Sequence, residues 1–366
     1  MTGIIIEMDK QIKISNGVSK AEIKLNWPIL GNGHIVDFLA KSLATDEVSG
    51  TYIFAGPAKL GKHTIANFFA YSLLCEKRLI AKSLPCGECP ACRQHLTVEM
   101  QKDEESLASI HADFHLLRRE KDKKNISVEQ VRDFIRILGM SSFLNSYKIG
   151  IIKHAETLSE EAANALLKTL EEPKDKVVII LITSDLEALP QTIVSRSQVL
   201  NFRPVKTDTI YDYLIKEHGV NRSQAKNLSR LALGRPALAV KFLEDKEFYE
   251  KYLQRVNVFL SFFQSDLNAR FTAVAEILGE KASGQEAAQI AKRILEVWHG
   301  LARDLFLASF GQEDLVQHEI VLPEIVRQKL TPAAMLNLDM SLRRAELYLR
   351  ANVNPKLVLE QVAMGI

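Results

Sequence analysis

The chain has no long apolar run, almost no net charge and few cysteines. Its 366 residues include 47 basic and 45 acidic side chains, for a net charge of +2, so no overall electrostatic field recruits nucleic acid or an anionic membrane. No uncharged apolar stretch approaches the roughly 20 residues that a membrane helix requires. The opening apolar run, 4–6, is too short for a signal peptide. We therefore expect a cytoplasmic protein without a membrane partner.

Short apolar runs and helical patterns alternate between residues 27 and 204. Strands are expected at 52–55, 113–117, 149–152 and 177–182. The last run is apolar throughout, as expected of a strand covered by helices on both faces. The alternation predicts a parallel α/β sheet of a nucleotide-binding type, with the loop after the first strand at the ligand edge.

Two helices in this region have clear boundaries. The segment 127–138 has apolar residues at three- and four-residue steps, with Ser127 as the expected N-cap. The segment 159–172 is rich in Ala, Leu and Glu and stops before Pro173, which cannot continue a helix.

The pattern changes beyond Pro204, where amphipathic helical runs follow one another and no convincing strand is found. We expect four parts: an N-terminal extension at 1–26 without a functional interpretation, a P-loop-type domain at 27–204, a small helical domain at 205–243 and a larger one at 244–366. A basic stretch at 118–125 is interpreted as a solvated loop, with a phosphate contact as the alternative.

A phosphate-binding loop follows the first expected strand. The segment 56–64, Gly-Pro-Ala-Lys-Leu-Gly-Lys-His-Thr, has the strand, glycine loop and helix context that a P-loop requires. The residue after Lys62 should offer a hydroxyl to magnesium, but it is His63, and Thr64 comes one position late.

The acidic half of an ATPase site is missing. The strand at 149–152 should end in carboxylates that hold the metal and orient water, but it runs into Lys153 and His154. We expect no hydrolysis at this site. Gly56, Gly61, Lys62 and Thr64 remain candidate nucleotide ligands, because backbone N–H groups at a helix start favour phosphate. Whether ATP or ADP binds stays open, and an empty loop is the alternative.

All four cysteines, Cys75, Cys86, Cys89 and Cys92, fall within 18 positions of sequence, 75–92. Two consecutive Cys-x-x-Cys steps favour a metal over disulfides in a reducing compartment. A four-thiolate set is typical of structural zinc, closed to catalysis. A redox Cys-x-x-Cys pair and four inert thiols are the alternatives. His95, His111 and His115 are also of a residue type that can bind metal, and we interpret them as histidines with local hydrogen-bond partners near the start of a strand.

These motifs together resemble the AAA+ clamp-loader subunits of bacterial DNA polymerase III. The resemblance covers about 27–366. It rests on the P-loop, the four cysteines, the helix 159–173, Ser195-Arg196 and the C-terminal segment 349–360. It implies an AAA+ domain with an inserted zinc module, a helical lid and a C-terminal collar that oligomerises. It also implies a hetero-pentamer with gamma/tau and delta subunits, which loads the sliding clamp onto primed DNA.

Within that family the gamma/tau ATPases have intact metal-binding acids, and the delta-prime subunit typically does not, so Lys153-His154 makes this chain similar to delta-prime. The resemblance implies that Arg196 acts as an arginine finger on ATP bound by a neighbouring gamma subunit. The family usually has Ser-Arg-Cys where this chain has Ser-Arg-Ser at 195–197. The alternative is a surface arginine that bonds a helix end.

Three further features leave alternatives open. The resemblance places a sensor 1 residue at Thr183-Ser184 and a sensor 2 arginine near Arg235, and both could instead be structural. An active gamma-type ATPase would need Thr64 on the metal and Glu156 at the site, although Glu156 is three residues too far along. A zinc-dependent DNA-binding protein is a third reading, which the near-neutral charge opposes.

Overall fold

The computed structural model describes residues 24–25, 27–78, 80, 83–94, 112–120, 123–142, 147–279, 284–312, 315–318 and 331–366. The chain forms two compact units. The first extends to Val220 and includes Gly234–Leu238, and the second comprises Asn221–Leu233 and Ala239–Ile366. His95, His111 and most of the 1–26 extension lie outside the described residues.

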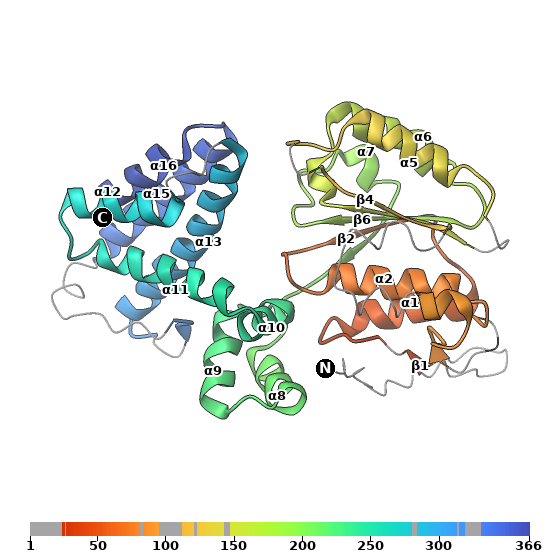
Figure 1. The fold of residues 1–366 in the computed structure, drawn as a ribbon, viewed down its shortest axis with the longest axis horizontal. Helices are drawn as coiled ribbons and strands as arrows, with labels where there is room; N and C mark the ends of the chain where they lie inside the picture. The colour runs from red at the N-terminus through yellow and green to blue at the C-terminus, as the bar shows by residue number, and fades with distance from the viewer. Residues whose placement is uncertain are drawn as a thin grey trace. The chain divides into compact units, whose positions relative to one another are not determined.

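The first unit is built on a five-stranded, fully parallel sheet (Figure 1). The strand order is β4 (Phe114–Leu117), β5 (Lys148–Lys153), β6 (Val177–Thr183), β2 (Thr51–Ala55) and β7 (Gln198–Asn201). The chain leaves β2, forms β4 at the far edge and returns stepwise, so that β6 and β7 flank β2. The loop after β2 therefore lies where the strand order reverses, which is the usual ligand position in such sheets.

The four strands expected from the sequence are confirmed to within two residues, and the fifth, β7, was missed. Its sequence Gln-Val-Leu-Asn has exposed polar residues at both ends, and only Leu200 is buried. A strand of this length with a single buried residue shows little hydrophobic signal.

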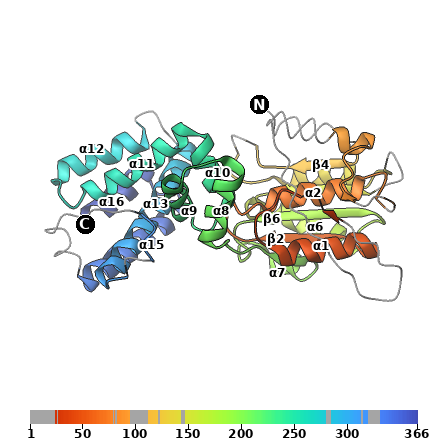
Figure 2. The same cartoon turned by 90° about the horizontal axis from the view of Figure 1, so that it is seen from below.

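Helices cover both faces of the sheet (Figures 1 and 2). One face is covered by α1 (Gly33–Thr45) and α2 (Lys62–Leu74), and the other by α5 (Val128–Leu138), α6 (Glu160–Glu171) and the short α7 (Gln191–Val194). Alternate residues of β6 enter the two cores, with Val178 and Ile180 on the α2 side and Ile179 and Leu181 on the α6 side. This double burial explains why β6 is apolar throughout.

The expected helix starts are confirmed. The Ser127 hydroxyl accepts a hydrogen bond from the Gln130 amide, and the Ser127 amide donates to the side-chain oxygen of Gln130, which completes a capping box. Ser159 Oγ accepts from the Ala162 amide at 3.1 Å. Each cap satisfies an amide that the helix itself cannot bond.

The first unit also contains β1 (Lys24–Leu25), β3 (Ser83–Leu84), η1 (Ala155–Thr157) and α8 (Thr207–His218). The two-residue strands β1 and β3 form a parallel pair. The single 3-10 turn η1 follows β5, and α8 follows β7.

The secondary structure of the second unit is helical, and its described residues contain no strand. Its helices are α9 (Arg222–Leu231), α10 (Pro236–Glu244, shared with the first unit), α11 (Lys246–Ser261), α12 (Leu267–Leu278), α13 (Gly284–Ser309), α15 (Pro332–Arg350) and α16 (Pro355–Met364). Trp298 is fully buried against Phe259 and Phe262. The division into domains at 205–243 and 244–366 stays a prediction. Among the described helices, none combines the length and the apolar character needed to cross a bilayer.

Candidate functional site

The loop between β2 and α2 has a backbone that requires glycine at two positions. Gly56 has φ 134°, and a Cβ there would lie 2.5 Å from the Phe202 carbonyl oxygen. Gly61 has φ 87° and forms the N-cap of α2. Both conformations are disfavoured for residues with a side chain. The glycine loop expected from the sequence is therefore present, and α2 begins at Lys62, directly after it.

Lys62 is folded back over this loop. Its ammonium donates to the carbonyl of Gly56 and, at 2.7 Å, to that of Pro57. The residue is only 6 % exposed. Burial lowers the pKa of Lys62 to about 8, and the negative charge of Glu156 opposes this shift. The Lys62 ammonium therefore has hydrogen-bond partners in the loop backbone, and it is attracted by the negative charge of Glu156.

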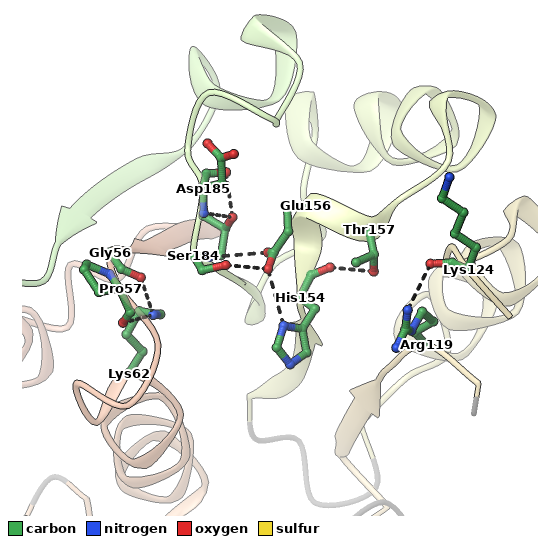
Figure 3. Close-up of polar contacts among 11 residues, drawn as sticks. Gly56, Pro57, Lys62, Arg119, Lys124, His154, Glu156, Thr157, Ser184 and Asp185 are labelled. Atoms are coloured by element: carbon green, nitrogen blue, oxygen red, sulfur yellow. Dashed lines mark hydrogen bonds and ion pairs between the residues drawn. The ribbon is translucent and has the colours of Figure 1, made fainter. Parts of the chain in front are cut away.

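The carboxyl end of β5 has no acid of its own. The strand ends at Lys153, and His154 follows in the left-handed region with φ 54°. This turn leads into η1, which places the Glu156 side chain against the end of β6 (Figure 3). The strand thus ends without an acid, and the Glu156 carboxylate comes from the turn that follows it.

Glu156 is held by three hydrogen bonds. The Ser184 hydroxyl donates to Oε1 at 2.7 Å, the Ser184 amide contacts Oε2 at 3.4 Å, and His154 Nδ1 lies 3.3 Å from Oε1. Burial raises the pKa of Glu156, but the bonds from His154 and Ser184 outweigh it and lower the pKa to about 2. The group is therefore a fixed anion at neutral pH.

The remaining residues near the loop have local partners. His63 Nδ1 lies 3.5 Å from Asn67 Nδ2, one turn along α2. Thr64 is half-buried in the first turn of the same helix. At the sensor 1 position the Thr183 hydroxyl donates to the Asp185 carbonyl at 2.8 Å, whereas Ser184 bonds Glu156. Of the expected site residues, Gly56, Gly61, Lys62 and Thr64 thus lie together.

Arg196 lies apart from these residues. It follows α7 and comes two positions before β7, whose first residue pairs with Tyr52 and whose last pairs with Ala55. Because these strands are parallel, Arg196 is at the amino edge of the sheet and the loop is at the carboxyl edge. Its guanidinium bonds the Thr192 carbonyl at 3.0 Å and forms a 2.7 Å ion pair with Glu171.

The four cysteines converge although they come from two segments. Their sulfur atoms all lie within 4.8 Å of one another. Cys75 directly follows α2, and the other three lie in the turn and short helix at 86–94. The sulfurs of Cys86 and Cys92 are 3.9 Å apart. A tetrahedral site with metal–sulfur bonds of about 2.3 Å would place its sulfurs about 3.8 Å apart, so the cluster fits one metal ion.

Two arginines, Arg119 and Arg235, are possible phosphate contacts from the sequence. Arg119, in the basic stretch at 118–125, donates to the Lys124 carbonyl at 3.3 Å. Arg235 is half-buried at the start of α10. The described part of the basic stretch is thus a bonded loop beside β4, as interpreted from the sequence.

The family model and several similar proteins carry DNA polymerase III names. The family model described as "DNA polymerase III, delta subunit" matches residues 31–206. The delta' subunit of DNA polymerase III from Bacillus subtilis is 26% identical over 334 residues, which are 90% of this chain and 94% of that protein. The delta' subunit from Pseudomonas aeruginosa is 37% identical over 145 residues, 40% of each chain. The tau subunit from Bacillus subtilis is 31% identical over 182 residues, 50% of this chain and 30% of tau.

Proposed function

Because the chain belongs to the family of DNA polymerase III clamp-loader subunits, with delta' and tau subunits among its relatives, we propose that it is a delta-prime-like subunit. In this proposal it does not hydrolyse ATP. It supplies Arg196 in trans to ATP bound by a neighbouring gamma/tau subunit.

The absence of hydrolysis is supported by the end of β5. Lys153 and His154 occupy the positions at which an ATPase holds its metal and orients water, and neither can replace a carboxylate. The Lys62 ammonium is bonded to the loop carbonyls of Gly56 and Pro57.

The position of Arg196 is the observation that carries the proposal. It lies at the edge of the sheet opposite its own loop, so its guanidinium cannot serve that loop. Its exposure at the far edge supports the proposal that it acts on a second subunit. Such a finger in trans is worth about 10³ to 10⁵ in rate, so one side chain can control a partner's ATPase.

The test is Arg196→Ala in a reconstituted clamp loader with gamma/tau, delta, the sliding clamp and primed DNA. We expect clamp- and DNA-stimulated ATP turnover at the one gamma/tau site that Arg196 would serve to fall by at least about 10³, with the assembly intact by size-exclusion chromatography. Arg203→Ala is the matched control, because Arg203 is an exposed arginine two residues beyond the other end of β7. Dissociation of the Arg196→Ala assembly would make Arg196 structural.

The same proposal assigns partners and a metal. The helical region at 244–366 would join gamma/tau and delta subunits in a hetero-pentameric collar, in the cytoplasm at the nucleoid. The four cysteines would hold one structural Zn²⁺, since four thiolates leave no open position for chemistry. A pull-down from cell extract that recovers none of these partners would contradict the assembly.

One observation favours a second function, an active gamma-type ATPase. Glu156 reaches the end of β6 and acts electrostatically on Lys62, so it is the one carboxylate that we can assign to such a site in the described residues. Magnesium-dependent ATP turnover by the isolated chain, abolished by Lys62→Ala, would establish that function.

A further inference from the structure

Glu156 and the phosphate-binding loop are neighbours through the sheet. Ala55 of β2 is paired in register with Thr183 of β6, so Gly56 and Ser184 are the next residues on two adjacent strands. Adjacent strands lie about 4.8 Å apart. Ser184 bonds the Glu156 carboxylate, and Gly56 bonds the Lys62 ammonium. An anion and a cation are thereby fixed at neighbouring strand ends (Figure 3).

The Glu156 side chain is not a mobile surface group. It is 16 % exposed, and both carboxylate oxygens are engaged by Ser184. Rotation away from β6 would break these bonds and leave a largely buried carboxylate without partners, which is costly. The negative charge therefore stays beside the loop.

We propose that Glu156 is a built-in counter-charge to Lys62 that opposes binding of nucleoside polyphosphates at the loop 56–61. A phosphate bound by the loop amides and Lys62 would have to share this partly buried edge with the Glu156 carboxylate. Like charges in a partly buried site repel more strongly than in water. The opposition grows with the number of phosphate charges.

This inference goes beyond the proposed function, because Arg196 could act on a neighbour whether or not this loop binds nucleotide. It is also the reverse of the ATPase alternative, in which Glu156 would serve as a ligand of magnesium. The two roles predict opposite effects of removing the charge. If Glu156 is a metal ligand, it strengthens nucleotide binding in the presence of Mg²⁺. If it is a counter-charge, it weakens nucleotide binding with or without Mg²⁺.

The experiment is calorimetric titration of the purified full-length chain with ATP, ADP and AMP, with EDTA and again with Mg²⁺. Glu156→Gln keeps the size of the side chain and removes its charge. We expect it to bind ATP about ten-fold more tightly than the wild type, with a smaller gain for ADP and almost none for AMP. Glu187→Gln is the matched control, since it removes an exposed charge from the turn after β6 and should change affinity less than about two-fold.

Equal or weaker ATP binding by Glu156→Gln, or a gain that is the same for all three nucleotides, would overturn the inference. Weaker binding seen only with Mg²⁺ would overturn it in favour of the metal-ligand role. A thermal melt checks that the variant is folded, and Glu156→Ala provides a second charge-free side chain if Gln is not tolerated. None of these measurements involves Arg196 or a partner subunit, so they can fail without affecting the proposed function.

Discussion

Arg196 and Glu171 form an ion pair, with Nη2 2.7 Å from Oε1, that joins the turn after α7 to the last residue of α6. A carboxylate at a helix C-terminus is unfavourable, and the guanidinium offsets it. The Thr192 carbonyl accepts a second bond from Arg196. The arginine is therefore oriented by its own subunit before any neighbour is present.

Loss of this orientation should affect the activity of the assembly more than the stability of the subunit. The pair is 36 % and 49 % exposed, so Glu171→Ala should cost less than about 1 kcal/mol of unfolding free energy. We expect the stimulated ATPase of the reconstituted loader to fall by about three- to ten-fold, because Arg196 is less well positioned. Glu172→Ala is the neighbouring control. Unchanged turnover in Glu171→Ala would show that the pair does not position Arg196.

The cysteine cluster predicts one zinc per chain and a structural effect of its removal. Cys89→Ser or prolonged chelation should release the metal and free the end of α2 from the turn at 86–94. We expect a loss on the order of several kcal/mol of stability and no direct change in chemistry. Elemental analysis and thermal melts measure both. A zinc content below roughly half an atom per chain in the wild type would count against the site.

A buried network should dominate the stability of the second unit. Asp304 is fully buried and accepts hydrogen bonds from His318 Nδ1 at 2.6 Å and from the backbone amides of Gln317 and His318. His318 is bonded in turn to Tyr252. Asp304→Ala leaves these donors without an acceptor, so we expect a cost of about 3 kcal/mol or more.

Urea unfolding followed by Trp298 fluorescence, in a Trp27→Phe background, measures this cost, because the chain has two tryptophans. Asp339→Ala is the control. Asp339 forms an exposed ion pair with Arg343 and should contribute less than about 1 kcal/mol. Equal effects of the two variants would contradict the importance of the network.

Glu156 predicts a defined pH dependence. Its pKa is lowered from an ordinary 4.5 to about 2 in the folded chain, so its stabilising contribution is fully present above pH 4.5 and is lost as the pH falls toward 2. The contribution is on the order of 3 kcal/mol. The stability advantage of the wild type over Glu156→Gln should be constant from about pH 5.5 to 7 and shrink below about pH 4.5. Urea midpoints at several pH values test this, and an advantage that grows on acidification would refute it.

The parts of the fold that were predictable are those with a local physical signal. Ser127 and Ser159 begin helices because their hydroxyls satisfy exposed amides, and that chemistry depends only on neighbouring residues. The apolar run of β6 reflects burial on both faces. In contrast, β7 is short and half polar, so no local pattern revealed it.

The site was predictable to a similar degree. Spacing alone pointed to the glycines, Lys62 and the four cysteines, and the structure brings the loop residues together and the four sulfurs together. Glu156 was judged too far along the chain because the sequence gives no indication that His154 adopts a left-handed backbone. That single turn redirects the chain so that η1 carries the Glu156 carboxylate to the end of β6. Non-glycine residues with positive φ are uncommon, so sequence patterns rarely predict such a turn.

The pairing of Lys24–Leu25 with Ser83–Leu84 has a practical consequence. A shortened protein that starts at Trp27, where the recognisable pattern begins, would lose the backbone partner of the residues immediately before Cys86. The backbone of β3 would then lose its partner strand, and the cysteine turn would keep fewer contacts with the rest of the first unit, among them the 2.9 Å ion pair of Lys77 with Glu88. Expression of the first unit by itself should therefore retain the residues before Trp27.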